Sequence, residues 1–532
     1  MAKPRFRVPA GSSRALAPAP RAWAPSPYTA GDQLASDGLV NYLPALGSAD
    51  GDLLRDRDMA TARARDLVRN DGWAAGGIGK EVDSVIGANF RPLSKPDARA
   101  LGLDDVWAKE FADAVDARWR SWADDPRMMA DAARAQPLPQ LFALAYRHYL
   151  IDGDALGVIG WNEDRPTRTT LRIVDPDLLA NPLGRQDGPE LRAGVEVDED
   201  GAATGYHFRR GHPADPWAGG RALEWDFWPR ETEWGRPMVL HFFDKHRDGQ
   251  TRGVSRLSPI VETLRMEQRY SVVEIQAAVI NAILGTFIES PFDNETVVDL
   301  LSDEGGAFGN YTSQRKEFHD ARQISLGGAR IPHLFPGEKI ATVAAARPAA
   351  QFAEFESAVL RKIAAGMGIT YEQLSADWSK TNYSSARAAL IELWRGWNAR
   401  RQSFAQRFCQ PLRLAWLEEQ FDAGGLPLPA GAPDFAENPA AYARAKWIGP
   451  GRGFVDPVKE AQAAAMRIAL GISTLEDEAA ELAGADYQDN LTQIAREIGE
   501  MPEGMLHPAQ ESFAKLIGGA PDNGEADRRP AA

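Results

Sequence analysis

The hydrophobic period of this chain changes from helical to alternating and back to helical, which limits the folds open to it. Between residues 104 and 122, Phe111, Val115, Trp119 and Trp122 recur at spacings of four, four and three, which predicts an amphipathic helix. Two further helices are predicted at 58–70 and 139–150. Strands are predicted at 157–161, 171–174, 195–209 (a hairpin turning at Asp200 and Gly201) and 238–243. The chain is therefore predicted to be α+β and mainly helical.

Long helices dominate the second half of the sequence. One is predicted from Ser255 towards Leu284, and a second carries Phe352 to Ile363 and ends at Gly366 and Gly368. A third is predicted from Ser384 to Phe421, and Pro411 should kink it because proline removes a backbone donor. A mixed stretch, 286–345, separates the first two helices, and a last helical unit spans 457–498 with breaks at Gly471 and Gly484.

Composition excludes several classes of protein. The single cysteine, Cys409, excludes an intrachain disulfide and a multi-cysteine zinc site. The sequence contains no run of about 18 apolar residues, so no membrane span is predicted. Among 532 residues, 60 are basic and 75 acidic, giving a net charge of −15. A chain this acidic is not expected to grip nucleic acid over its whole surface, although a local basic face remains open to it.

The first 31 residues differ from the rest, since they hold five basic residues, six prolines and no acid. This composition predicts a disordered basic arm, and the apolar core of a secretory signal is absent. The arm is either a plain tail or a segment that docks on a partner or is trimmed during assembly. A flexible C-terminal tail is predicted at 501–532.

The search for catalytic motifs gives no positive support for an enzyme. The stretch from Gly76 to Lys80 lacks the residues that a phosphate-binding loop requires before and after it. It is therefore predicted to form a tight turn within a helix. His241, Asp244 and His246 match no ligand spacing of a metal site, and Asp152 and Asp154 predict a solvated turn. The motifs G-x-S-x-G and H-E-x-x-H are absent. No catalytic residue, metal or cofactor is therefore predicted.

One segment is unusually basic for this acidic chain. Between Ser384 and Arg413 only Glu392 opposes six arginines, namely Arg387, Arg395, Arg400, Arg401, Arg407 and Arg413. Such a helix either faces solvent and carboxylates of a neighbouring subunit or contacts a polyanion, and the first four arginines are the candidates for contacts with DNA or a subunit. The preceding loop is rich in hydroxyl and amide groups that suit a phosphate backbone. Its candidate residues are Trp378, Lys380, Thr381, Asn382, Tyr383, Ser384 and Ser385.

Several short segments, in this order and spacing, carry a resemblance to a known family. They are 63–70, 241–259 with its Gln250-Thr-Arg-Gly-Val-Ser255, 334–338, 360–371, Asn382-Tyr-Ser-Ser-Ala-Arg387, 455–460 and 471–474. Together they resemble the portal proteins of tailed bacteriophages of the lambda type, over about residues 28–500.

The resemblance implies a non-enzymatic ring of about twelve subunits at one vertex of the virion capsid, assembled in the cytoplasm of a bacterial host. Double-stranded DNA would pass through the ring during packaging and ejection. The implied partners are the large terminase subunit, the major capsid or scaffold protein and a head–tail adaptor, with no membrane. Lys380 and nearby arginines would then offer DNA brief contacts against an acidic background.

The family's parts divide the sequence as follows. After the arm at 1–31, the resemblance implies a wing (32–253), a stem helix (254–285), a small mixed α/β clip (286–345), a second stem helix (346–371), a tunnel loop (372–385), a long helix with a return to the wing (386–455) and a helical crown (456–500). Two alternatives stay open on the residues alone: a packaging motor or nuclease, and another ring or adaptor protein of the virion.

Overall fold

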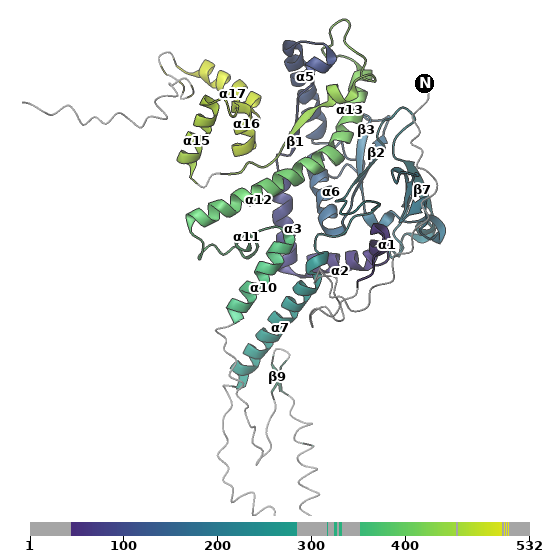
Figure 1. Cartoon of the computed structure of the whole chain (residues 1–532), viewed down its shortest axis with the longest axis vertical. Helices are drawn as coiled ribbons and strands as arrows, with labels where there is room; N and C mark the ends of the chain where they lie inside the picture. Colours follow the sequence, from purple (N-terminus) through teal and green to yellow (C-terminus); the bar gives the residue numbers. More distant parts are fainter. Residues whose placement is uncertain are drawn as a thin grey trace, which may run out of the picture.

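The computed structural model describes residues 44–284, 317, 324–326, 329–331, 352–453, 456–502, 505, 507 and 509. A mainly helical body carries small sheets, and the helices α7 (Val261–Leu284) and α10 (Phe352–Met367) project from it side by side (Figure 1). The predicted arm, most of the predicted clip and most of the predicted tail lie outside the described residues. None of the described helices is long and apolar enough to cross a membrane.

Six α-helices are described between residues 49 and 152, and three of them confirm the helices predicted at 58–70, 104–122 and 139–150. The six are α1 (Ala49–Leu53), α2 (Arg57–Asn70), α3 (Gly72–Val85), α4 (Ala98–Leu101), α5 (Asp105–Ala123) and α6 (Leu138–Asp152). Asp71 and Asp104 begin α3 and α5 by accepting hydrogen bonds from the backbone N–H of Ala74 and Trp107, at 2.8 and 2.7 Å. The tight turn predicted at 76–80 is wrong, because these residues lie inside α3 and its backbone hydrogen bonds continue through them.

Two antiparallel sheets form the β-rich unit. One has the order β3-β2-β8, with β2 at Ala155–Trp161, β3 at Thr169–Val174 and β8 at Val239–Phe242. The other has the order β4-β5-β6-β7, from Leu191–Arg192, Val195–Val197, Ala203–Arg209 and Trp225–Pro229. The pairing of β5 with β6 confirms the predicted hairpin. A third ladder joins β1 (Arg91–Ser94) to β11 (Ala445–Ile448), so a late segment returns to an early one.

The projecting helices are joined to the body at a sharp turn. At the end of α10, Gly368 has a φ of +71°, and a Cβ there would lie 2.5 Å from Nη2 of Arg400. Glycine is therefore required, as the predicted helix end at this position implied. A short helix, α11 (Tyr371–Ser375), follows. Of the mixed stretch between the projecting helices, the structure describes the antiparallel pair β9 (Ile324–Leu326) and β10 (Ala329–Ile331).

The third long helix is interrupted at the predicted place. It consists of α12 (Tyr383–Phe404), a π-helical turn at Ala405–Cys409 and α13 (Gln410–Ala423). Pro411 cannot donate to a carbonyl of the preceding turn, which accounts for the irregular turn just before it. The chain then forms α14 (Pro439–Ala443) and, after β11, the helices α15 (Pro457–Ala469), α16 (Leu475–Glu478) and α17 (Tyr487–Glu500), with Gly484 in the left-handed region between the last two.

The hydrophobic core holds only the C-terminal part of the third helix. Trp416, Phe404 and Phe408 are fully buried against aromatic side chains of α5 and α6, with Trp119 and Trp416 centroids 5.0 Å apart. In contrast, Ile391 near the start of α12 is 39% exposed. The long helix is thus anchored at one end and carries the loop 376–382 at the other.

Candidate functional site

Local hydrogen bonds shape the loop between α11 and α12. Ala376 takes a left-handed conformation at the end of α11, and the side chain of Asp377 accepts from the backbone N–H of Ser379 at 3.0 Å. Hydrogen bonds from Ser379 hold the pKa of Asp377 below its usual value. Asn382 caps α12, because its side chain accepts from the backbone N–H of Ser385 at 2.9 Å. The loop is therefore short, defined and fixed to the helix behind it.

The predicted loop residues stand together at the surface. Trp378 is 43% exposed, and Lys380, Ser384 and Ser385 are exposed as well. Thr381 is half-buried, since its hydroxyl donates to Glu372 at 3.3 Å. Tyr383 begins α12, and its side chain lies outside the described part. Within the described ranges, the Lys380 ammonium forms no ion pair and is available to a partner.

The four candidate arginines of α12 separate into two pairs. Arg387 is half-buried and Arg395 is exposed, and neither makes a hydrogen bond or an ion pair with the described residues. Arg400 donates to Glu81 of α3 at 2.7 Å, and Arg401 donates to the carbonyls of Val85 and Ser84 at 2.8 and 2.9 Å. The second pair therefore binds its own chain, which leaves Arg387 and Arg395 for a partner.

Burial explains why Arg400 and Arg401 matter to the fold. Glu81 is 1% exposed, and burial raises its pKa although the charges of Arg400 and Arg256 oppose that shift. Burial also lowers the pKa of Arg401 to about 10. A buried charge is costly unless it is paired and hydrogen-bonded, so these contacts fasten α12 to α3.

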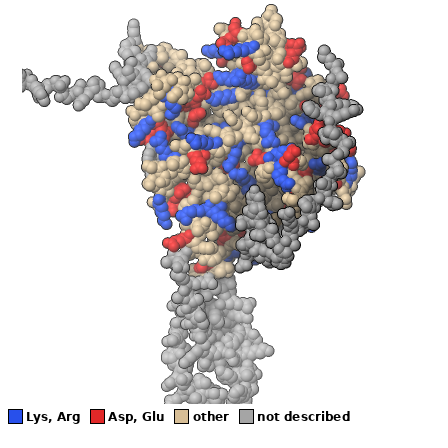
Figure 2. Space-filling model, in the orientation of Figure 1, with Lys and Arg blue, Asp and Glu red and all other residues tan. Residues whose placement is uncertain are grey.

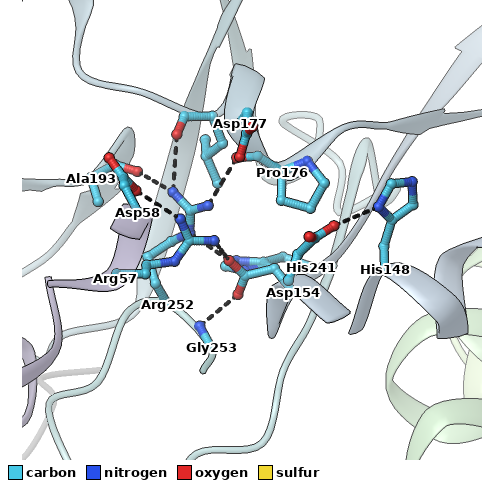
Figure 3. A network of polar contacts seen from close by, with 12 residues as sticks. Arg57, Asp58, His148, Asp154, Pro176, Asp177, Ala193, His241, Arg252 and Gly253 are labelled. Atoms are coloured by element: carbon cyan, nitrogen blue, oxygen red, sulfur yellow. Dashed lines mark hydrogen bonds and ion pairs between the residues drawn. The ribbon is translucent and has the colours of Figure 1, made fainter. Parts of the chain in front are cut away.

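A buried ionic network fixes the segment that leads into α7. Asp154, at the start of β2, is fully buried and accepts from Arg57 Nη2, Arg252 Nε and Gly253 N, at 2.7, 2.7 and 2.6 Å. The two guanidinium groups converge on this one carboxylate (Figure 3). The solvated turn predicted for Asp152 and Asp154 is wrong, because Asp152 is buried too and pairs with Arg65 at 2.7 Å.

Arg252 connects this network to the β-rich unit. Its guanidinium also donates to the carbonyl oxygens of Leu179, Ala193 and Pro176, at 3.0, 2.7 and 3.0 Å. The turn between α6 and β2 needs Gly153, whose φ is +88° and where a Cβ would lie 2.4 Å from the backbone nitrogen of Val254. The base of α7 is thereby clamped to α2, β2 and the second sheet.

The charges of the network settle its protonation. Burial by itself would raise the pKa of Asp154, but the charges of Arg252 and Arg57 outweigh it and hold the pKa well below the usual value. The Nε2–H of His241 donates to the ionised Asp154 at 3.1 Å, and burial lowers the pKa of His241, so the ring is neutral at pH 7. Sequence reasoning missed this site, although Arg252 lies inside one of the segments that carry the family resemblance.

A metal centre finds no support in the described ranges, where no three His, Cys, Asp or Glu side chains are placed to hold an ion. On the face drawn in Figure 2, basic and acidic side chains are interspersed over the body. This face therefore has no single broad basic field.

Comparison with known proteins shows which family this chain belongs to. The model of the phage portal proteins of the lambda family matches residues 38–401, more than half of the chain. This chain belongs to that family. It is 33% identical to the portal protein of Escherichia phage N15 over 498 residues, covering 92% of this chain and 93% of that one. Portal protein B of Escherichia phage lambda is 32% identical over 498 residues, with 92% of each chain covered.

Solved structures align less closely. A chain from the virion of a native gene transfer agent particle has a TM-score of 0.37 and 14% identity, covering 82% of this chain and 94% of that one. A chain from the neck of the native particle has a TM-score of 0.33 at 14% identity, covering 80% and 98%. The family assignment therefore rests on the sequence matches. Portal proteins are structural components of the capsid, so this one is not an enzyme, and the portal is selected over the motor, nuclease and adaptor alternatives.

Proposed function

We propose that this portal protein closes into a ring of about twelve copies at a capsid vertex and conducts double-stranded DNA during packaging and ejection. In this assembly α7 and α10 are the stem, residues 372–385 with the loop at 376–382 the tunnel loop, and α15 to α17 the crown. The ring would dock the large terminase subunit during packaging and a head–tail adaptor afterwards. The family assignment and the surface of α7 support the proposal.

The exposed apolar side chains of α7 are the main support for the proposed ring. Large apolar side chains are exposed along this helix: Met266 (61%), Val272 (48%), Val273 (50%), Ile275 (64%) and Val279 (45%). At 3.6 residues per turn they fall within about half of the circumference of the helix. Contact with α10 and α2 covers only one side. An exposed apolar face of this extent marks an interaction site, so this side of α7 needs a cover.

Copies of the same chain supply that cover in a closed ring. Each subunit then presents one side of its stem to the preceding copy and the other side to the next, which is a heterologous interface that closes by rotation. Burying apolar surface stabilises such contacts by about 25 cal/mol per Å². A monomer would leave this surface in water, at the cost of solubility.

Lys380, Arg387 and Arg395 are proposed as the DNA contacts. These cations are few, and the whole chain carries a net charge of −15. Each phosphate that a cation neutralises releases counterions, so a few cations give weak, salt-sensitive contacts. Weak contacts suit a duplex that must slide through the ring and not stop. The hydroxyl and amide groups of Thr381 and Asn382 would add contacts to the backbone that carry no sequence preference.

Electron microscopy of the purified full chain in negative stain, classified end-on, tests the ring. We expect rings of about twelve-fold symmetry with a central hole. Ile275→Glu should prevent closure because it adds a charge to the proposed interface. Val106→Glu is the matched control, since Val106 is 69% exposed on α5, far from α7. Rings formed by Ile275→Glu as readily as by Val106→Glu would contradict the proposed interface, and monomers of the unmodified chain at every salt concentration would contradict the ring.

A further inference from the structure

A hollow of about 700 Å³ lies between the β-rich unit and the start of α13. Strands β5 and β6 form one wall, with Val195, Val197 and Tyr206, and Pro411 and Leu414 contribute to the other. The proposed ring and DNA contacts use none of these residues. The volume falls in the range of sites that hold a small ligand or a short peptide segment.

Two of the cations that line this hollow have no carboxylate partner within the described ranges. Arg230 is exposed and forms no ion pair within the described ranges. Arg407 is exposed too and lies over the ring of Phe242, with its guanidinium carbon 5.0 Å from the ring centroid. Lys245 pairs only with Asp248, a fully exposed neighbour three residues away. Glu231 is the one acidic side chain among the lining residues, so the lining carries a net positive charge.

Tyr206 also lines the hollow. Tyr206 is 4% exposed, and its phenolic oxygen has no hydrogen-bond partner among the described residues. The register of β6 and β7 pairs Gly205 with Pro229, so Arg230 follows opposite Thr204 and lies on the same face of the sheet as Tyr206. Burial raises the pKa of Tyr206 to about 12, against the opposing charge of Arg230, so the hydroxyl stays a donor at neutral pH. This donor makes no hydrogen bond with the described residues, so it can donate to an acceptor that enters the hollow.

We infer that this hollow is a docking groove for an extended acidic peptide segment of a partner protein. A carboxylate would accept from Tyr206 and pair with Arg230 or Arg407, and hydrogen bonds of this charge-assisted kind are the strong ones. The valine, proline and leucine walls suit apolar side chains that alternate with the acidic ones along an extended strand. The groove does not depend on the ring.

Fluorescence anisotropy with the purified full chain tests the groove. The probe is a labelled, end-blocked peptide of alternating glutamate and valine, and the comparison probes are its lysine counterpart and a labelled single-stranded oligothymidine. We expect the acidic peptide to bind and the other two to bind far more weakly. Tyr206→Phe, Arg230→Gln and Arg407→Gln should each weaken binding by about tenfold, the value of a charged hydrogen bond.

Arg99→Gln is the matched control, because Arg99 is exposed on α4 away from the groove and should leave affinity unchanged. Thermal melting of each variant separates a lost contact from a lost fold, and Tyr206→Phe retains the ring that stacks on Phe208 at 6.2 Å. The inference is overturned if the acidic peptide does not bind, if the lysine peptide or the oligonucleotide binds as well, or if the groove variants bind like Arg99→Gln.

Discussion

Asp154→Asn should loosen the base of α7, and the structure sets the size of the effect. The change keeps the shape of the side chain but removes the charge that Arg57 and Arg252 share, each at 2.7 Å. All three side chains are at most 4% exposed. Breaking a buried ion pair from one side costs about 3–5 kcal/mol, because the remaining charge stays buried and unpaired.

Hydrogen exchange measures this loss where it occurs. The backbone N–H of Gly253 donates to Asp154 at 2.6 Å, so a peptide covering residues 250–256 reports the anchor directly. A loss of about 3–5 kcal/mol corresponds to roughly 10²- to 10⁴-fold faster exchange where opening is local. The matched control is Asp58→Asn, which also removes a partner of Arg57, at 3.3 Å, but from a carboxylate that is 96% exposed. It should leave exchange unchanged.

The pH dependence gives a second check. The folded pKa of Asp154 lies well below its usual value, so its stabilisation is complete above the unfolded pKa of about 3.9 and disappears as pH falls through the folded pKa. The gap between wild type and Asp154→Asn should therefore stay constant at neutral pH and narrow only under strong acid. Equal protection in Asp154→Asn and Asp58→Asn, or a gap that closes near neutrality, would refute the reasoning.

Three further predictions follow from the loop and the third helix. The change Lys380→Glu, made alone or together with Arg387→Glu and Arg395→Glu, should alter the length of the packaged DNA or its retention. Rings should stay intact in micrographs. Unchanged packaging would contradict the proposed DNA contacts. Arg400→Ala should lower the free energy of unfolding in urea by roughly 2–3 kcal/mol, because Glu81 stays buried without its 2.7 Å partner, whereas Arg395→Ala should change little. Gly368→Ala should lower the melting temperature through its φ of +71° and the contact at 2.5 Å, whereas Gly396→Ala, which has no atom within 4 Å of the added Cβ, should raise it slightly.

Local patterns were enough for the elements of the fold. Phe111 and Trp119 predicted the buried face of α5, Pro411 predicted the break in the third helix, and Gly368 predicted the end of α10, because each depends on neighbours within a turn or two. The loop residues Trp378 and Lys380 were likewise found as a group, since they are contiguous and precede a capped helix.

The side chains of the third helix could not be ranked from the sequence. The sequence does not distinguish among Arg387, Arg395, Arg400 and Arg401. In the structure, however, the last two donate to Glu81 and to the carbonyls of Ser84 and Val85, more than 300 residues earlier in the chain. Which arginine faces a partner is decided by what packs against α12. Helical spacing gives the face of a residue but not the identity of the element across from it.

The sequence by itself determined most of the long helices, several of the strands, the family and the absence of a catalytic motif, because these depend on short spacings and on order along the chain. Only the tertiary structure decided that Asp152 and Asp154 are buried and ion-paired. An Asp-Gly-Asp turn favours solvent until Arg57 and Arg252, 97 and 98 residues away from Asp154, are brought to it. A carboxylate can be buried only where opposite charge and donors replace water, and folding alone assembles those partners.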